Sequence, residues 1–166
     1  WPLLTRGISF WSSKKEGDQS QIYLVGNYVG WYLIDIAVLV FLGLFVFDQL
    51  AILRQFEWIT PYARQKLHGT LFWLFLGWAF HYLPFYLMGR QLFLHHYLPA
   101  QISGSLLVGG LVHLITGQCD EPRGRYTENQ AIKVVVYTAI AAEVLMFVYW
   151  SPFVYGLHLS AAAVRA

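Results

Sequence analysis

The sequence predicts an all-α membrane protein with about four transmembrane helices. Of its 166 residues, 57% are hydrophobic and only 12% are charged, whereas roughly a quarter of the residues are charged in an ordinary soluble domain. Four apolar stretches also reach about 20 residues, the length that an α-helix needs to cross a hydrocarbon core about 30 Å thick. This composition excludes a disordered chain and a disulfide-stapled secreted module, and a net charge of +2 predicts no nucleic-acid partner.

The four predicted spans follow one another along the chain. They run from about 31 to 53, from 67 to 88, from 97 to 116 and from 131 to 150. Thr60 followed by Pro61 is typical of a helix start, so we expect the second helix to begin before it enters the membrane. Thr127 and Gln130 resemble a capping box ahead of the fourth helix. Pro84 is expected to kink the end of the second span.

These spans divide the chain into three parts. Residues 1–30 are expected to form a lumenal or interfacial segment, residues 31–158 a four-helix transmembrane region, and residues 159–166 a short tail. The loops on one side of the membrane carry six Lys and Arg residues, and those on the other side carry five. Because cytoplasmic loops are usually the more basic, this count slightly favours an orientation with both termini facing the lumen or exterior. The chain begins with Trp1 and has no signal peptide of its own, so we expect a processed chain or a fragment.

The densest group of polar and aromatic residues lies in the hairpin between the second and third spans. Arginine presents a planar fork of donors that suits phosphate oxygens, and histidine can donate to a phosphate when it is charged, or through one nitrogen when it is neutral. We therefore predict a site for a lipid-linked phosphate at the bilayer boundary, whereas the alternative is an interfacial belt of snorkelling and anchoring side chains. The residues expected at the phosphate are Arg90, His81, His95 and His96, and those expected to line the lipid or sugar are Phe85, Tyr86 and Tyr97. Histidine spacing does not support a metal site, and none is expected.

Polar residues inside the spans are costly and need an explanation. Asp48 lies near the end of the first span and close to Arg54, so we expect a snorkelling or paired end charge. Glu143 lies in the middle of the fourth span, where either a functional role or an interhelical hydrogen bond would explain it. Ser105 and Gly109 form a pair of small residues that predicts close approach to another helix.

A longer pattern appears in the same hairpin. The run LGWAFHYLPFYLMGRQLFLHHYLPA at 76–100 resembles the C-terminal membrane region of the protein O-mannosyltransferases. WPLLTRGI at the start resembles the segment that follows the lumenal MIR domain of this family, and PFVYG at 152–156 resembles its ending. IYLVGN at 22–27 resembles the Leu-Gly-Asn motif, although Tyr28 stands where the family usually has Pro.

The resemblance implies part of a multi-pass endoplasmic reticulum enzyme with a GT-C-type glycosyltransferase fold. Such enzymes transfer mannose from dolichyl phosphate mannose to Ser or Thr of secretory proteins, and they need no cofactor besides this lipid-linked donor. The expected partners are therefore membrane lipid, the donor, the acceptor protein and a related mannosyltransferase in a dimer. The catalytic acid of the family belongs to an N-terminal lumenal loop, so this chain is expected to resemble the last third of the enzyme, to hold no catalytic residue and to be inactive alone.

Two other functions are open to this sequence. The first is a non-catalytic membrane module that assembles with the other subunits of a larger complex. The second is a carrier or redox protein that uses Glu143 and the histidines. Bound haem or metal in purified material would favour the second alternative.

Overall fold

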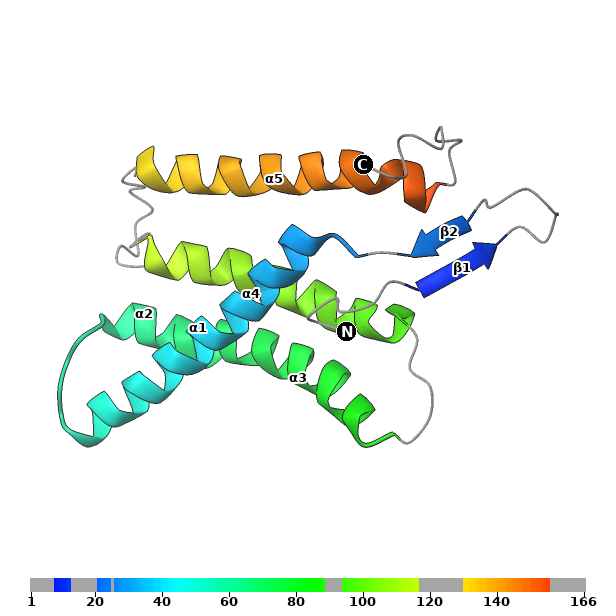
Figure 1. Ribbon diagram of the computed structural model, residues 1–166. Coiled ribbons are helices and arrows are strands. Elements are labelled where there is room, and N and C mark those ends of the chain that lie inside the picture. The colour runs from blue at the N-terminus through cyan, green and yellow to red at the C-terminus, as the bar shows by residue number, and fades with distance from the viewer. Residues whose placement is uncertain (1–7, 13–20, 25, 89–93, 117–129, 156–166) are drawn as a thin grey trace.

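The computed structural model describes residues 8–12, 21–24, 26–88, 94–116 and 130–155, and helices dominate it (Figure 1). Its elements are the strands β1 (Ile8–Ser12) and β2 (Gln21–Leu24), the helices α1 (Tyr28–Leu53), α2 (Pro61–Lys66), α3 (Phe72–Tyr86), α4 (Leu98–Ile115) and α5 (Gln130–Val154), the π-helical turn η1 (Leu67–Leu71) and the 3₁₀ turn η2 (Leu94–Tyr97). Helix α4 packs against both α1 and α3, α1 and α3 meet through aromatic side chains, and α5 contacts α1 and β2. The all-α membrane class predicted from the sequence is confirmed for the body of the chain.

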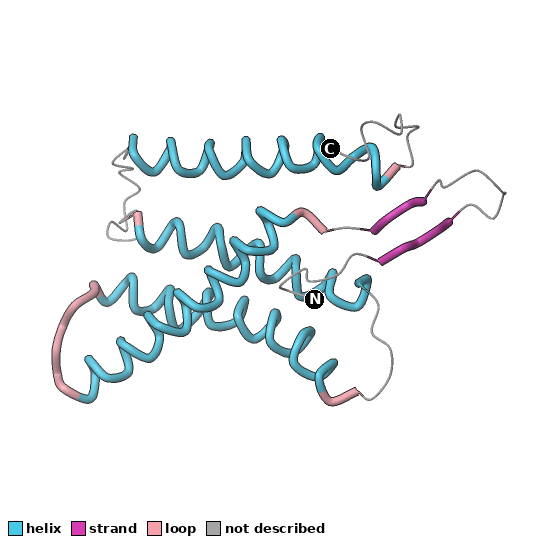
Figure 2. The backbone as a smooth tube through the Cα atoms, in the orientation of Figure 1, coloured by secondary structure: helices cyan, strands magenta, loops and turns pink. Residues whose placement is uncertain are grey.

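The two strands are the part of the fold that the sequence did not predict. They pair antiparallel, with Ile8 opposite Leu24 and Ser12 opposite Gln21, and the register shifts between Ser9 and Trp11. Figure 2 shows this hairpin projecting from the end of the helical body where α1 begins. The apolar stretch at 22–25, which is too short to cross a membrane, thus belongs in part to a strand.

Within the residues that the structure describes, three helical segments are each long and apolar enough to cross a membrane: Tyr28–Leu53, Leu98–Ile115 and Lys133–Pro152. The second predicted span is present as the consecutive elements α2, η1 and α3, which follow one another from residue 61 to residue 86. At about 1.5 Å per residue, this run reaches about 39 Å and therefore also exceeds the membrane core.

The ends of the second span agree with the sequence in detail. Thr60 caps α2, since its hydroxyl oxygen accepts a hydrogen bond of 3.2 Å from the backbone N–H of Ala63, and Pro61 occupies the first turn. Pro84 lies inside α3, which ends two residues later. Thr127 of the predicted capping box lies outside the described residues, and α5 begins at Gln130.

The core lies where α1, α3 and α4 cross, and small residues allow the close approach. A Cβ added to Gly104 would lie 2.5 Å from Ile34 Cγ2 and 3.3 Å from Trp78 Cδ1, and one added to Gly110 would collide with Leu71. The residues buried in this core include Trp31, Ile34, Phe41, Leu67, Leu71, Trp78, Tyr97, Ala100, Leu107 and Leu111.

The prediction that another helix closely approaches α4 at Ser105 and Gly109 is wrong for the helices of the described chain. Both residues are exposed, and a Cβ added to Gly109 would meet no atom within 4 Å. Helix α4 instead turns Gly104 and Gly110 toward its neighbours, because these residues share a face with the buried Leu107 and Leu111.

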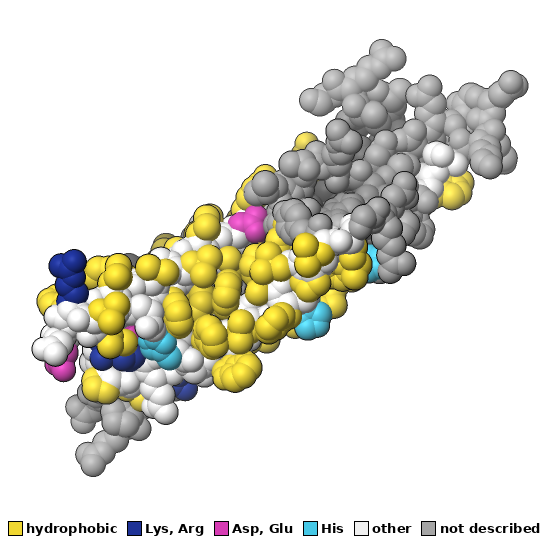
Figure 3. Space-filling model, turned by 90° about the horizontal axis from the view of Figure 1, so that it is seen from below, with side chains coloured by type: hydrophobic (Ala, Val, Ile, Leu, Met, Phe, Trp, Pro, Cys, Tyr) yellow, Lys and Arg dark blue, Asp and Glu magenta, His cyan; other side chains and the backbone are white. Residues whose placement is uncertain are grey.

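The outside of the helical body is apolar. Figure 3 shows hydrophobic side chains along the middle of one face, with Lys and Arg side chains gathered toward one end. The membrane-spanning window of α5 contains no buried residue within the described part of the chain. Such a surface suits lipid, because hydrocarbon tails do not penalise exposed Val, Leu and Phe side chains.

Candidate functional site

The hairpin predicted to hold a phosphate lies at the end of the bundle where α3 ends and α4 begins. Helix α3 ends at Tyr86, and η2 leads directly into α4 at Leu98. Figure 1 shows that the β-hairpin lies toward this same end. Arg90 lies outside the described residues, so its assignment to a phosphate stays a prediction.

The predicted histidines occupy different environments. His81 is exposed on α3, and its Nδ1 lies 2.7 Å from the carbonyl oxygen of Gly77, which can only accept, so Nδ1 carries the proton. His96 is half-buried, and its ring meets the ring of Phe85 edge to face at 5.4 Å. The backbone of His95 belongs to η2, and its side chain lies outside the description.

The geometry of His81 restricts what its ring can do. Because Nδ1–H already donates to Gly77, the neutral ring offers only an acceptor at Nε2. A phosphate oxygen also accepts, so a neutral His81 ring could donate to a phosphate only by giving up its bond to Gly77.

Tyr97 is a packing residue rather than part of an open lining. It is 2% exposed, its ring lies 4.8 Å from that of Trp31, and its hydroxyl oxygen accepts a hydrogen bond of 3.3 Å from Trp78 Nε1. The ring of Tyr82 meets it edge to face at 5.6 Å. These contacts join α1, α3 and η2, and they leave Tyr97 almost no surface for a ligand.

The other two aromatic residues predicted for the lining lie at the end of α3. Phe85 is half-buried against His96. Tyr86 is the last residue of α3, and its side chain lies outside the description. Both residues are thus held at the hairpin end, and their contact with a ligand stays a prediction.

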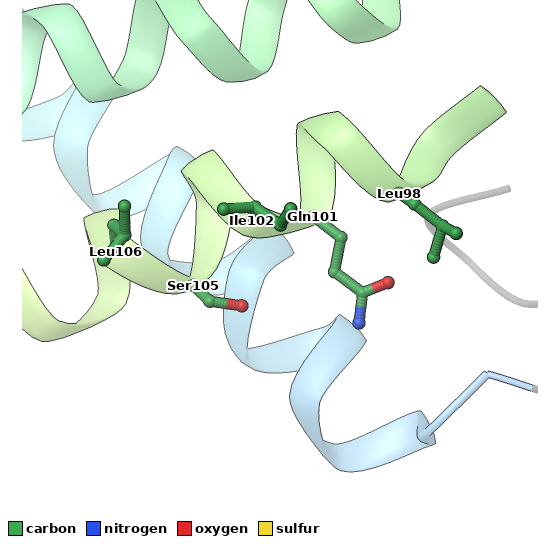
Figure 4. A pocket seen from close by; sticks show the side chains of 5 residues that line it. All are labelled: Leu98, Gln101, Ile102, Ser105 and Leu106. Atoms are coloured by element: carbon green, nitrogen blue, oxygen red, sulfur yellow. The ribbon is translucent and has the colours of Figure 1, made fainter. Parts of the chain in front are cut away.

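A shallow groove follows the first half of α4. It has a volume of about 500 Å³ and a mainly apolar lining. As Figure 4 shows, the described side chains that line it come from α4; they are Leu98, Gln101, Ile102, Ser105 and Leu106. The groove thus begins next to Tyr97 and runs from the hairpin end into the membrane-spanning part of the helix.

The strongest polar cluster of the described residues lies at the opposite end of the bundle. Asp48 is 0% exposed, and it accepts hydrogen bonds from Trp58 Nε1 at 2.7 Å, from Arg64 Nε at 3.1 Å and from His68 Nε2 at 2.7 Å. A terminal nitrogen of Arg64 also lies 3.1 Å from the carboxylate. We call these four residues the Asp48 cluster.

The Asp48 cluster corrects one expectation and reveals a feature that the sequence reasoning missed. Asp48 is a paired charge, but its partner is Arg64 and not Arg54, so the expected proximity to Arg54 does not identify the ion pair. Arg64 and His68 are four residues apart, which is the spacing of one helix face. The sequence could have shown from this spacing that Arg64 and His68 share a helix face. It could not have shown that Asp48 of α1 lies opposite that face.

Glu143 lies beside the first turn of α1. A Cβ added to Gly30 would be 3.2 Å from its Oε1, and the side chain of Asn27 donates a hydrogen bond of 3.0 Å to its backbone oxygen. Unpaired N–H groups give a helix start a partial positive charge, which stabilises a nearby carboxylate. The arrangement favours the structural explanation of Glu143 over the functional one.

The apolar helical fold, with the Asp48 cluster at one end of the bundle, defines a multi-pass, α-helical membrane region. A family model described as the C-terminal four TMM region of protein-O-mannosyltransferase matches residues 1–166, and the chain belongs to this family. The resemblance noted in the hairpin at 76–100 is thereby confirmed over the whole chain.

Curated relatives agree with this membership. Dolichyl-phosphate-mannose–protein mannosyltransferase 4 of Candida albicans is 36% identical over 170 residues, which cover 100% of this chain and 22% of the relative. The protein of the same name from Saccharomyces cerevisiae is 38% identical, with 94% of this chain and 22% of the relative covered. The chain therefore spans about a fifth of the length of these relatives.

A solved structure has the same fold. It is described as the S. cerevisiae protein O-mannosyltransferase Pmt1-Pmt2 complex bound to the sugar donor, and the similarity has a TM-score of 0.79 at 32% sequence identity. The match covers 99% of this chain and 21% of the solved chain.

Proposed function

We propose that this chain forms the C-terminal membrane part of an enzyme that transfers mannose from dolichyl phosphate mannose to Ser or Thr hydroxyls of secretory proteins. The observation that carries the proposal is the match of the whole chain to the mannosyltransferase family and to relatives named for this activity. The enzyme would reside in the endoplasmic reticulum membrane. The catalytic carboxylate would come from another part of the polypeptide, so the chain alone should be inactive.

In the proposed reaction, the acceptor hydroxyl gives its proton to a carboxylate base and attacks the anomeric carbon of mannose. The bond from that carbon to the phosphate oxygen breaks, and dolichyl phosphate leaves with additional negative charge. A cation held close to the phosphate stabilises the transition state, because the charge develops there. We assign this role to Arg90, with assistance from His81, His95 or His96.

The groove on α4 supports a site for a lipid-linked donor at this end. It starts at Leu98, one residue after η2, and extends to Leu106, a distance of about 12 Å along a helix at about 1.5 Å per residue. Its mainly apolar lining suits a polyprenyl chain whose phosphate remains at the bilayer surface. Phe85 and Tyr86 would face the sugar or the first isoprene units.

We also propose that the full-length protein forms a dimer with a related mannosyltransferase. The supporting observation is the similarity to a chain from the Pmt1-Pmt2 complex, which is itself an assembly of two mannosyltransferases. Co-purification of the full-length protein with each related mannosyltransferase of the same cell would test this. Recovery of the monomer alone would contradict it.

Arg90→Ala in the full-length enzyme tests the donor site. Transfer of labelled mannose from dolichyl phosphate mannose to a Ser/Thr peptide should fall about 100-fold, the usual loss when one preorganised electrostatic contact to a transition state is removed. Arg90→Lys should retain part of the activity, because it keeps the charge but not the planar fork.

Arg54→Ala is the matched control for this experiment. Arg54 is exposed beyond the end of α1, on the opposite side of the bundle, so its removal should leave transfer unchanged. Wild-type activity in the Arg90→Ala enzyme would exclude the assignment of Arg90. A full-length wild-type protein that assembles with its partner but transfers no mannose would instead favour the assembly-module alternative.

A further inference from the structure

The second span contains a wide helical turn. Residues 67–71 form the π-helical turn η1 between the α-helical segments α2 and α3. Such a turn has i→i+5 hydrogen bonds and holds about one residue more than an α-helical turn. Since π-helical turns are uncommon and poorly favoured, the surrounding contacts must hold this one in place.

Two sets of contacts fix η1 on both sides. Leu67 and Leu71 are buried, and Leu71 lies against Gly110 of α4. His68 contacts α1, where its Nε2 donates to Asp48 at 2.7 Å and its ring lies 4.9 Å from that of Phe45. The bond from His68 to Asp48 is the shorter of two polar contacts of this ring with α1, since His68 Nδ1 also lies 3.5 Å from Gln49 Nε2.

The extra residue determines which way α3 faces. An α-helix turns by about 100° per residue, so closing the wide turn without removing a residue would rotate all of α3 by about 100°. Such a rotation would take Gly77 away from Ser103 of α4, with which it is now in close contact. It would also turn His81 and Phe85 away from their present positions at the hairpin end.

We infer that His68, through its hydrogen bond to Asp48, holds the wide turn η1 and thereby sets the rotational position of α3. His68 is then a positioning residue for the hairpin end, although it lies at the far end of the same span. The consequence for donor binding rests on the proposed function, whereas the rotation of α3 does not.

A disulfide between α3 and α4 provides the direct test. A Cβ added to Gly77 lies 3.4 Å from Ser103 Cβ, which is near the 3.5–4.5 Å common in disulfides, so Gly77→Cys with Ser103→Cys should form a bond. The pair is made in the full-length protein with Cys119→Ser, and the linked peptides are identified by mass spectrometry. The bond should form when η1 is intact.

Two changes are then made in this background. His68→Ala should abolish the link, because η1 closes and α3 rotates. Deletion of Gly69, whose added Cβ would meet no atom within 4 Å, should retain the link, because it removes the extra residue and lets the turn become α-helical without rotation. Combining His68→Ala with this deletion should therefore restore the link.

The combined variant separates a role in position from a general loss of folding. Persistence of the link in the His68→Ala protein would overturn the inference, and so would failure of the Gly69 deletion to retain or restore it. Mannose transfer is measured on the same proteins, with an increase of the donor KM expected for His68→Ala and a return toward wild type in the combined variant. If the disulfide is lost in the His68→Ala protein and returns in the combined variant while the donor KM stays unchanged, the rotation of α3 is upheld. The donor site at the hairpin end is then contradicted.

Discussion

Replacing Asp48 by Ala should be among the most destabilising single changes in this membrane region. The carboxylate is fully buried and accepts hydrogen bonds from Trp58, Arg64 and His68, which come from three different segments. Removing it breaks the connection between the end of α1, the loop after it and the start of the second span. It also leaves a guanidinium group and two N–H donors facing an apolar side chain.

The magnitude follows from these contacts. A hydrogen bond to a charged group contributes about 1.5–3 kcal/mol, so the bonds from Trp58 and His68 together account for about 3–6 kcal/mol. The contribution of Arg64 is discounted, because its side chain is 29% exposed and can turn toward water. The total agrees with the loss of about 3–5 kcal/mol that follows when one partner of a buried ion pair is removed.

The assay is unfolding of the full-length protein in detergent micelles, followed by near-ultraviolet circular dichroism of the tryptophans. Asp48→Ala should lower the free energy of unfolding by about 4 kcal/mol, and Asp48→Asn by about half as much, since the amide oxygen still accepts one hydrogen bond. Glu57→Ala is the matched control, because Glu57 is an exposed acid in the adjacent loop and should change stability by less than about 0.5 kcal/mol.

The reasoning would be refuted by an Asp48→Ala protein whose stability lies within about 0.5 kcal/mol of wild type. It would also be refuted if Glu57→Ala and Asp48→Ala had equal effects, because the loss would then depend on charge at this end of the bundle and not on burial. A double-mutant cycle with Arg64→Ala measures how much of the loss belongs to the ion pair.

Three further changes are expected to have distinct effects on unfolding in the same assay. Gly104→Ala should cost about 1–3 kcal/mol, because the added Cβ collides with Ile34, and a smaller loss would mean that α1 and α4 separate freely. Gly109→Ala, on the same helix, should be neutral or stabilise by up to about 1 kcal/mol, and a loss comparable to that at Gly104 would show that this face is covered. Thr60→Ala should cost about 1 kcal/mol by removing the cap on Ala63, whereas Thr60→Ser should cost little; equal losses would contradict the capping role.

The helical spans could be predicted because each depends on local composition. A run of about 20 apolar residues has few folded alternatives in a membrane, and Thr60 with Pro61 marks a helix start through its own backbone geometry. The β-hairpin could not be predicted in the same way. Its strands of five and four residues are too short to show a clear alternation of apolar and polar residues, and the sequence alone does not give their register, which shifts between Ser9 and Trp11.

The polar residues show where sequence reasoning stops. A spacing of four residues places Arg64 and His68 on one helix face, but it cannot reveal that Asp48 on another helix lies opposite. Small residues likewise predict close packing without saying on which side, so Gly104 and Gly109 look equivalent in the sequence although only Gly104 meets a neighbour. Such distinctions depend on tertiary geometry.

The Asp48 cluster has a consequence for how the chain enters the bilayer. Asp48 lies five residues from the end of α1, so the carboxylate sits about 8 Å inside the helix end. Because an unpaired charge at such a depth is costly, the first two spans should leave the translocon together as a neutral pair rather than one after the other. Glycosylation mapping of the nascent protein would show this as inefficient insertion of the first two spans when Arg64 is replaced by a neutral residue.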